Sequence, residues 1–425
     1  MNRETSLAAF LDTATSSYLA VAEITELLLT EGYTPLQEAE EWNLSQGGKY
    51  FLSRNDASLF AFRLPKKKAV GFQIAAAHTD SPAFQYKKSF TASGYTRLSV
   101  ERYGGARNVT WLDRPLSVSG RVFVKKEGKL LSYIVDVKEP VAIIPSVAGH
   151  LMKETGDNPA VDMLPFCATD KEGDAVLYHI AEALKIDPSD IVSHDLYMYP
   201  YEKAVLWGKE SCYISSPRLD DLQSVYGLLQ GFLSAEDNQK AIPLLALFDS
   251  EEVGSRTMHG ADSSFLNSVL ERIALALGEN PHCLLANSFL VSADNAHARH
   301  PNHPELSDTN GLTPVLNEGI VIKHNANKRY TTDGLSEGLF SLLCEQAGVP
   351  LQHYANRPDL LGGSTLGALA ISHTSVYSLD IGLAQLAMHS AMETAGTKDT
   401  LYLEKAMALF FARSLYRDKE GIGWA

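Results

Sequence analysis

Long apolar runs, closely spaced cysteines and an excess of basic residues are all missing from the chain, and each absence excludes a class of protein. No apolar segment approaches the roughly 20 residues that a membrane-spanning helix needs. A formal net charge of -14 argues against nucleic acid and membranes as partners. The N-terminal residues have no signal-peptide core, so we expect a cytoplasmic location. The four cysteines stand far apart, which favours reduced thiols over a disulfide framework or a zinc cluster: Cys167, Cys212, Cys283 and Cys344.

The length of 425 residues is too great for one ordinary core, so we expect two domains. A helical period at 16–31 is followed by strand-like runs at 59–64 and 70–76, and Lys66–Lys68 between them predicts a hairpin turn. From about residue 83 the pattern changes to short strand-like runs with one helix near 174–184. We therefore predict a discontinuous first domain, 1–82 with 216–425, and an inserted smaller α/β oligomerisation domain, 83–215.

From residue 218 onward, helical and strand-like segments alternate. This alternation predicts an α/β fold with a mixed, mostly parallel sheet flanked by helices. Ligands bind such sheets at the carboxyl ends of the strands. The predicted strands are 242–248, 288–293 and 376–381, and the predicted helices are 222–233, 265–277, 334–347 and 400–416.

Two adjacent carboxylates, Glu251 and Glu252, follow the apolar run 242–248. Neighbouring side chains at a strand end point in different directions. One carboxylate can therefore hold a metal ion while the other faces the water on that metal. An isolated acidic pair is usually a solvated surface feature. The apolar flank and further ligand-type residues at other element ends favour a site.

Other histidines and carboxylates stand at element ends: His78 and Asp80, Asp220, Asp294, and His389. Two histidines with three or four carboxylates are the ligand set of a two-metal hydrolase, and they suit Zn²⁺ with Mn²⁺ or Co²⁺ as substitutes. Asp80 is placed to orient the imidazole of His78. Individually, each residue has an ordinary alternative, such as a helix cap for Asp220 or a surface position for His389.

Five segments carry these residues: Ala-Ala-His-Thr-Asp-Ser-Pro at 76–82, Ser-Pro-Arg-Leu-Asp-Asp at 216–221, Ser-Glu-Glu-Val-Gly-Ser at 250–255, Val-Ser-Ala-Asp-Asn-Ala-His-Ala-Arg-His-Pro-Asn at 291–302 and Met-His-Ser at 388–390. Together they strongly resemble the aspartyl aminopeptidase family of zinc exopeptidases. The fourth segment is the most specific, whereas the third is shared with related two-metal aminopeptidases. The motifs run in the family's order along almost the whole chain. One departure is Met392, where many relatives carry Arg.

The resemblance implies an aminopeptidase that removes N-terminal Asp or Glu from short peptides, with two Zn²⁺ ions per subunit. Glu251 would be the general base that moves a proton from the attacking water to the leaving amine. Asp221 would support the ligands without binding metal. The implied ligands are Asp220 as the bridge, His78 with Asp294 at one ion, and His389 with Glu252 at the other.

Two further residues are implied by weaker correspondences. His150 would stabilise the oxyanion in a neighbouring subunit's active site. Its alternative is a histidine at a helix start in its own module. Lys323 would bind the acidic side chain of the substrate, and its alternative is a surface lysine at a strand end. The family forms large homo-oligomers, commonly tetrahedral dodecamers, so a homo-oligomer is expected here.

Three competing hypotheses remain at this point. The nearest is a related two-metal aminopeptidase or N-acyl amidohydrolase with non-acidic specificity. A catalytically silent scaffold of the same fold is disfavoured because Glu251 and the five ligand residues are all present. A metal-storage protein would need many more exposed carboxylate clusters.

Overall fold

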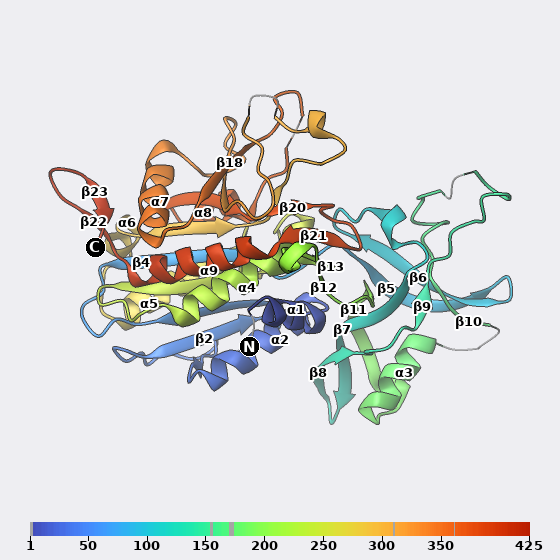
Figure 1. Cartoon of the computed structure of the whole chain (residues 1–425). Helices are drawn as coiled ribbons and strands as arrows, with labels where there is room; N and C mark the ends of the chain where they lie inside the picture. The colour runs from blue at the N-terminus through green and yellow to red at the C-terminus, as the bar shows by residue number, and fades with distance from the viewer. Residues whose placement is uncertain (1–2, 154–155, 170–173, 309–310, 361) are drawn as a thin grey trace.

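The computed structural model describes residues 3–153, 156–169, 174–308, 311–360 and 362–425. A nine-stranded mixed sheet forms the centre of one part of the molecule, drawn at the left of Figure 1. Its strands, in spatial order, are β1 (Thr34–Pro35), β2 (Lys49–Arg54), β3 (Ser58–Arg63), β14 (Ala241–Phe248), β4 (Gly71–His78), β15 (Phe289–Ala293), β19 (Tyr377–Gly382), β17 (Ile320–His324) and β18 (Leu351–Ala355).

The middle of this sheet is parallel. Strand β4 pairs in parallel with β14 and with β15, and β15 pairs in parallel with β19. Strands β3 and β4 do not pair, because β14 lies between them and is antiparallel to β3. The hairpin predicted around Lys66–Lys68 is therefore wrong. All eight residues of β14 are buried, and its apolar run gains a hydrogen-bonded neighbour on each side in this arrangement.

Helices cover both faces of the nine-stranded sheet. One face packs against α1 (Arg3–Thr13), α2 (Ser17–Thr30), α4 (Leu219–Ser234), α7 (Gly334–Ala347) and α9 (Thr397–Ala412). The other packs against α5 (Phe265–Ala276), α6 (Pro281–Ala286) and α8 (Leu366–His373). The central strands are continuous apolar runs in the sequence because their side chains are buried against helices on both faces of the sheet. Among the described residues, none of the helices has the length and apolarity required to cross a bilayer.

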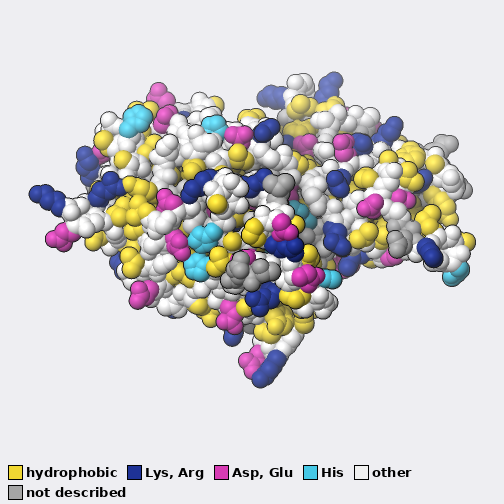
Figure 2. All heavy atoms as spheres, turned by 90° about the horizontal axis from the view of Figure 1, so that it is seen from above, with side chains coloured by type: hydrophobic (Ala, Val, Ile, Leu, Met, Phe, Trp, Pro, Cys, Tyr) yellow, Lys and Arg dark blue, Asp and Glu magenta, His cyan; other side chains and the backbone are white. Residues whose placement is uncertain are grey.

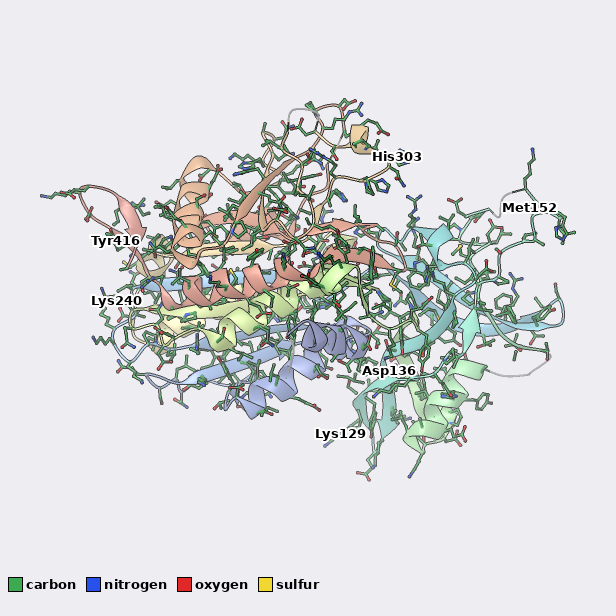
Figure 3. The ribbon with its side chains drawn as sticks, viewed as in Figure 1. Lys129, Asp136, Met152, Lys240, His303 and Tyr416 are labelled. Carbon is green, nitrogen blue, oxygen red and sulfur yellow. The ribbon has the colours of Figure 1, made fainter. Side chains whose placement is uncertain are left out.

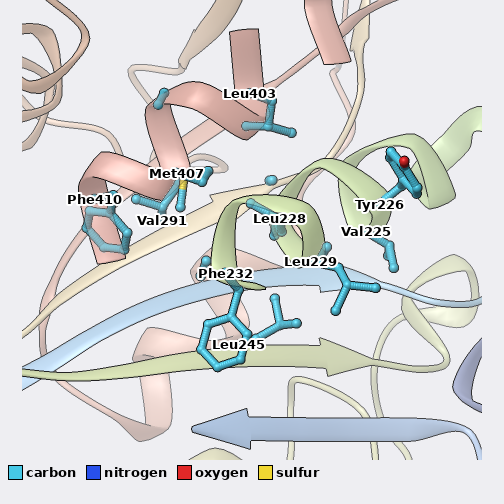
Figure 4. Close-up of a cluster of buried hydrophobic side chains, with 14 of the residues drawn as sticks. Val225, Tyr226, Leu228, Leu229, Phe232, Leu245, Val291, Leu403, Met407 and Phe410 are labelled. Carbon is cyan, nitrogen blue, oxygen red and sulfur yellow. The ribbon is translucent and has the colours of Figure 1, made fainter. Parts of the chain in front are cut away.

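Helices α4 and α9 pack closely over β14 and β15. Figure 4 shows Phe232 of α4 beside Leu245 of β14, with Met407 of α9 near Val291 of β15. A Cβ atom on Gly231 would lie 2.7 Å from the Cβ of Met407. A small residue is therefore required at Gly231, and this contact fixes α4 against the sheet.

Helix α9 ends earlier than the periodicity of 400–416 predicts. It stops at Ala412, and β22 (Leu415–Arg417) follows and pairs with β23 (Ile422–Trp424). The Asn238 amide donates to the carbonyls of Phe411 and Arg413, at 3.1 and 2.6 Å. This tertiary contact ends the helix at a point that local periodicity does not reveal.

A seven-stranded antiparallel sheet forms the part drawn at the right of Figure 1. An additional pairing between its first and sixth strands closes it on itself, and α3 (Ala175–Leu184) begins at the N-cap Asp174. The strands, in order, are β11 (Ile191–Pro200), β5 (Ala83–Ala92), β6 (Tyr95–Tyr103), β10 (Phe166–Thr169), β9 (Ala142–Ile143), β7 (Pro115–Lys126) and β8 (Lys129–Asp136).

A five-stranded sheet combines strands from distant parts of the sequence. It joins β12 and β13, from the end of the predicted insertion, to strands near the C-terminus. The division of the chain at residues 82 and 216 stays a prediction. The strands are β12 (Val205–Trp207), β13 (Tyr213–Ser216), β21 (Glu393–Gly396), β20 (Ala384–Leu386) and β16 (Ala296–His297).

Candidate active site

The carboxyl ends of β4, β14 and β15 meet at one edge of the central sheet, because these neighbouring strands are parallel. His78 is the last residue of β4, and Asp294 directly follows β15. Glu251 and Glu252 begin the short 3₁₀ helix η4 (Glu251–Val253) after β14. All four line a cavity of about 260 Å³, together with Asp220 and other residues.

Asp220 faces both histidines of the predicted site. Its Oδ1 lies 3.7 Å from Nε2 of His78, and its Oδ2 lies 3.4 Å from Nε2 of His389. His389 Nε2 also lies 3.3 Å from Oε1 of Glu252. The two ligand groups are His78 with Asp220 and Asp294, and Asp220 with Glu252 and His389; within each, the ligand atoms lie within 4.8 Å of one another.

The site carries buried acceptors that the protein does not satisfy. Oδ1 of Asp220 and Oε1 of Glu252 are buried and accept no hydrogen bond. Burying such an oxygen costs free energy unless a cation or a water molecule binds it. Burial lowers the pKa of His389, but the carboxylates of Asp220 and Glu252 raise it overall to about 11. The cluster thus attracts positive charge, and the donor set fits divalent metal ions such as Zn²⁺.

Asp80 holds the turn that carries the two glutamates. Its Oδ1 accepts the backbone N–H of Glu251 and its Oδ2 that of Glu252, both at 3.1 Å. The hydroxyl of Tyr103, at the end of β6, donates to Oδ2 at 2.8 Å. Nδ1 of His78 lies 3.0 Å from the backbone oxygen of Asp80 and 3.5 Å from its Oδ1. Asp80 therefore links His78, the Glu251 turn and the seven-stranded sheet.

The Glu251 carboxyl lines the cavity beside the two ligand groups. Burial, together with the charges of Asp294, Glu252 and Asp80, raises its pKa to about 8, while the His78 charge opposes this shift. A carboxyl with a raised pKa in a cleft is a feature of proton-transfer sites.

Asp220 and His389 are positioned by Glu393, which the sequence patterns did not single out. Glu393 accepts the N–H of Asp220 at 3.0 Å and that of His389 at 2.6 Å. His389 has a φ of 66°, an unusual value for a non-glycine residue. The loop after β6 also contacts it: a Cβ on Gly105 would lie 2.7 Å from Nδ1 of His389, and Arg107 N–H donates to its carbonyl. Apart from the bond between Glu393 and His389, which are four residues apart, these contacts join distant segments of the chain, so no local motif signals them.

Lys323 lies in the same cavity. Its side chain is buried, and its Nζ is 3.4 Å from Oδ1 of Asp294. Burial lowers the pKa of Lys323, but Asp294 and further acidic groups raise it overall, so the side chain is an ammonium. Its Nζ lies 5.5 Å from the ring centre of Tyr330. Lys323 is therefore not a surface lysine.

His150 is exposed and lies apart from this cavity in the single chain. Met152, two residues further on, is labelled at the upper right of Figure 3, at the outer end of the seven-stranded part. Asp221, by contrast, is buried beside the ligands, and its Oδ2 accepts the N–H of His78 at 3.2 Å.

The sequence matches the family described as "Aminopeptidase I zinc metalloprotease (M18)" over residues 10–411. The chain belongs to the M18 family of zinc aminopeptidases. It is 40% identical to a probable M18 family aminopeptidase 2 of Clostridium novyi over 420 residues, which is 95% of this chain and 96% of the relative. A protein of the same description from Ectopseudomonas mendocina is 37% identical over 417 residues, with 95% and 96% covered.

Solved structures share the M18 fold along the chain. The structure described as the Ape4 and Nbr1 complex contains a chain that is 35% identical, with a TM-score of 0.92, over 96% of this chain and 85% of that one. Yeast aminopeptidase 1 (Ape1) is 29% identical, with a TM-score of 0.86, and 96% of each chain is covered. The mixed α/β fold is thus that of M18 metalloaminopeptidases.

Proposed function

We propose that this M18 protein removes N-terminal Asp or Glu from short peptides and uses two divalent metal ions, Zn²⁺ or in its place Mn²⁺ or Co²⁺. One observation carries the proposal: two groups of ligand atoms share Asp220 in a cavity that also holds the buried ammonium of Lys323. The shared carboxylate supports a bridged metal pair, and the ammonium supports selection of an acidic residue.

The proposed ligands have the chemistry that zinc requires. Imidazole nitrogens and carboxylate oxygens are its ordinary protein ligands, and the unsatisfied oxygens of Asp220 and Glu252 are ready to accept a cation. When bound, the two ions would polarise the scissile carbonyl and acidify the attacking water. His78, Asp220 and Asp294 would hold one ion, and Asp220, Glu252 and His389 the other.

Glu251 would take the proton of the attacking water and give it to the leaving amine. Asp80 accepts the backbone N–H of Glu251 and so fixes the turn. In this turn the Glu251 carboxylate would be the proton acceptor, and Glu252, the next residue, would be a metal ligand beside His389. Asp80 would act as a positioning residue for this turn and for His78, because it contacts both.

Lys323 would bind the side-chain carboxylate of the N-terminal residue. A charged hydrogen bond of this kind contributes about 1.5–3 kcal/mol. Lys323 is 3% exposed, so water does not compete strongly for its ammonium group. A neutral side chain such as leucine would leave this buried charge without a substrate partner, which disfavours it.

We also propose a homo-oligomer, and a tetrahedral dodecamer is its expected form. One M18 neighbour, mApe1, is described as a dodecamer. Figure 2 shows hydrophobic side chains at the right end of the molecule. Exposed apolar side chains at Val147, Leu151 and Val161 lie in the segment that contains His150. Such patches mark interfaces, and this one would carry His150 to a partner's site. A cytoplasmic location stays a prediction.

A set of matched peptides tests the proposal. Peptides that differ only in an N-terminal Asp, Glu or Leu, each with a free or an acetylated amino terminus, are incubated with the protein and the products are analysed by mass spectrometry. We expect cleavage of the free Asp and Glu peptides. Preference for Leu would favour a related two-metal aminopeptidase, and cleavage of acetylated peptides alone would favour an amidohydrolase.

A further inference from the structure

A second cluster of metal-ligating side chains lies outside the active-site cavity. It consists of His324, Glu337 and His353, whose ligand atoms lie within 4.8 Å of one another. All three side chains are half-buried, with exposed fractions between 30 and 39%. We propose that this cluster is a third metal site, which binds Zn²⁺ or a similar divalent transition-metal ion.

Strand pairing brings the two histidines onto one face of the sheet. In the parallel pair β17 and β18, His353 is opposite Ile322, and side chains alternate between the faces of a strand. His324 therefore lies on the same face as Ile322 and His353. Ile322 packs in the hydrophobic cluster that includes Phe340 of α7, so this is the α7 face.

Lys323 points to the opposite face of β17. Val321, two residues before Lys323 and on the same face of the strand, belongs to a separate hydrophobic cluster with Tyr330 and Tyr354. These two tyrosines also line the active-site cavity. The third site and the active site are thus on opposite sides of one strand. Glu337, in the first turn of α7, completes the cluster from the helix that covers the α7 face.

The distances fit a tetrahedral ion. His324 Nε2 lies 3.0 Å from His353 Nδ1. Glu337 Oε1 lies 3.6 Å from His353 Nδ1 and 3.9 Å from His324 Nε2. Zinc with bonds of about 2.0–2.2 Å separates its tetrahedral ligands by roughly 3.3–3.5 Å, so shifts of half an ångström or less close the site.

Nε2 of His324 and Nδ1 of His353 are within hydrogen-bond distance of each other, whereas the Glu337 carboxylate makes no direct hydrogen bond to either ring. A direct hydrogen bond of an imidazole N–H to oxygen has a length of about 2.7–3.2 Å, and both Glu337 contacts are longer. A metal ion between the three atoms would satisfy Glu337 and both nitrogens together. Two histidines and one carboxylate are an established zinc ligand set, and the partial exposure leaves room for water as a fourth ligand.

Metal at this site would fasten β17 and β18 to the start of α7. His324 directly follows Lys323, so the ion would fix the strand end that carries the proposed specificity residue. Any ion that binds only the folded chain also raises its stability in proportion to the logarithm of its free concentration. Occupancy would therefore appear both in metal content and in the unfolding temperature.

Metal content decides the proposal. The metal-free full-length protein, His353→Ala and Glu337→Gln are each dialysed against buffered free Zn²⁺, and bound zinc is counted by mass spectrometry. His373→Ala is the matched control, because His373 has a similar exposed fraction of 41% and contacts one carboxylate, Asp262, at 2.8 Å. We expect each cluster variant to bind one ion fewer than the unsubstituted chain and the control.

The unfolding temperature gives a second readout that separates this site from the active site. At high free Zn²⁺ we expect a smaller zinc-dependent rise for Glu337→Gln than for His373→Ala. Equal zinc content in the unsubstituted chain and in both cluster variants would overturn the third site, whatever the count at the active site. A loss in His353→Ala that Glu337→Gln does not share would also contradict it.

Discussion

Lys323 Nζ lies 3.4 Å from Oδ1 of Asp294, and both side chains are buried. A metal ion on Asp294 would draw negative charge away from this contact. The ammonium would then require another anion, because an unpaired buried charge is costly. The acidic side chain of a substrate would provide it, which links the metal site to specificity within one cavity.

Replacement of Lys323 by methionine tests this link. Lys323→Met keeps the length of the side chain but removes its charge, so kcat/KM for an aspartyl substrate is expected to fall by roughly 10- to 150-fold, the equivalent of 1.5–3 kcal/mol. The value for a leucyl substrate is expected to change much less. Equal losses of kcat/KM on the two substrates in steady-state assays would show that Lys323 does not recognise the side chain of the N-terminal residue.

Glu251 and Glu252 provide a matched pair of substitutions with opposite expected results. Glu251→Gln is expected to keep both metal ions and to lower kcat by about 10²–10⁴-fold, because it removes only the proton acceptor. Glu252→Gln is expected to lose one metal ion, because it removes a ligand. Zinc content and kcat are measured on the same samples. A near-normal rate for Glu251→Gln would remove Glu251 as the base.

Tyr103 is expected to act through Asp80. Tyr103→Phe removes a 2.8 Å hydrogen bond to the buried Asp80 carboxylate, and we expect a loss of about 1–3 kcal/mol in unfolding free energy together with a lower kcat. Tyr201→Phe is the control, since the Tyr201 hydroxyl donates to the carbonyl of Lys138 in an exposed contact. If both variants unfold at the same denaturant concentration as the unsubstituted chain, Asp80 does not depend on Tyr103.

Mixed oligomers test whether His150 acts in a partner's site. His150→Ala is expected to lower kcat without changing zinc content or molecular mass. Co-assembly of His150→Ala with Glu251→Gln subunits is expected to restore part of the activity, because some sites then combine an intact Glu251 with a partner's intact His150. Mixtures no more active than their separate components would contradict action in trans. Dissociation of His150→Ala would show a role in assembly instead.

The sequence indicated most ligand candidates because they stand beside an apolar run or a helix start, and the resemblance of Met-His-Ser at 388–390 indicated His389. His78, Glu252 and Asp294 follow strands, and parallel pairing of those strands brings them together. The contacts of Tyr103 with Asp80 and of Glu393 with Asp220 could not be predicted, because each joins separate segments of the chain. The order of the strands could not be predicted either, because nothing in the sequence around Lys66–Lys68 indicates that β14 lies between β3 and β4.

Metal-dependent cleavage of acidic substrates is the most direct test of the account. The purified protein is assayed on aspartyl-, glutamyl- and leucyl-4-nitroanilide as isolated, after chelation, and after addition of Zn²⁺, Mn²⁺ or Co²⁺. We predict that the acidic substrates are preferred, that chelation abolishes cleavage and that metal restores it. Cleavage that survives complete metal removal, or that favours the leucyl substrate, would contradict the account.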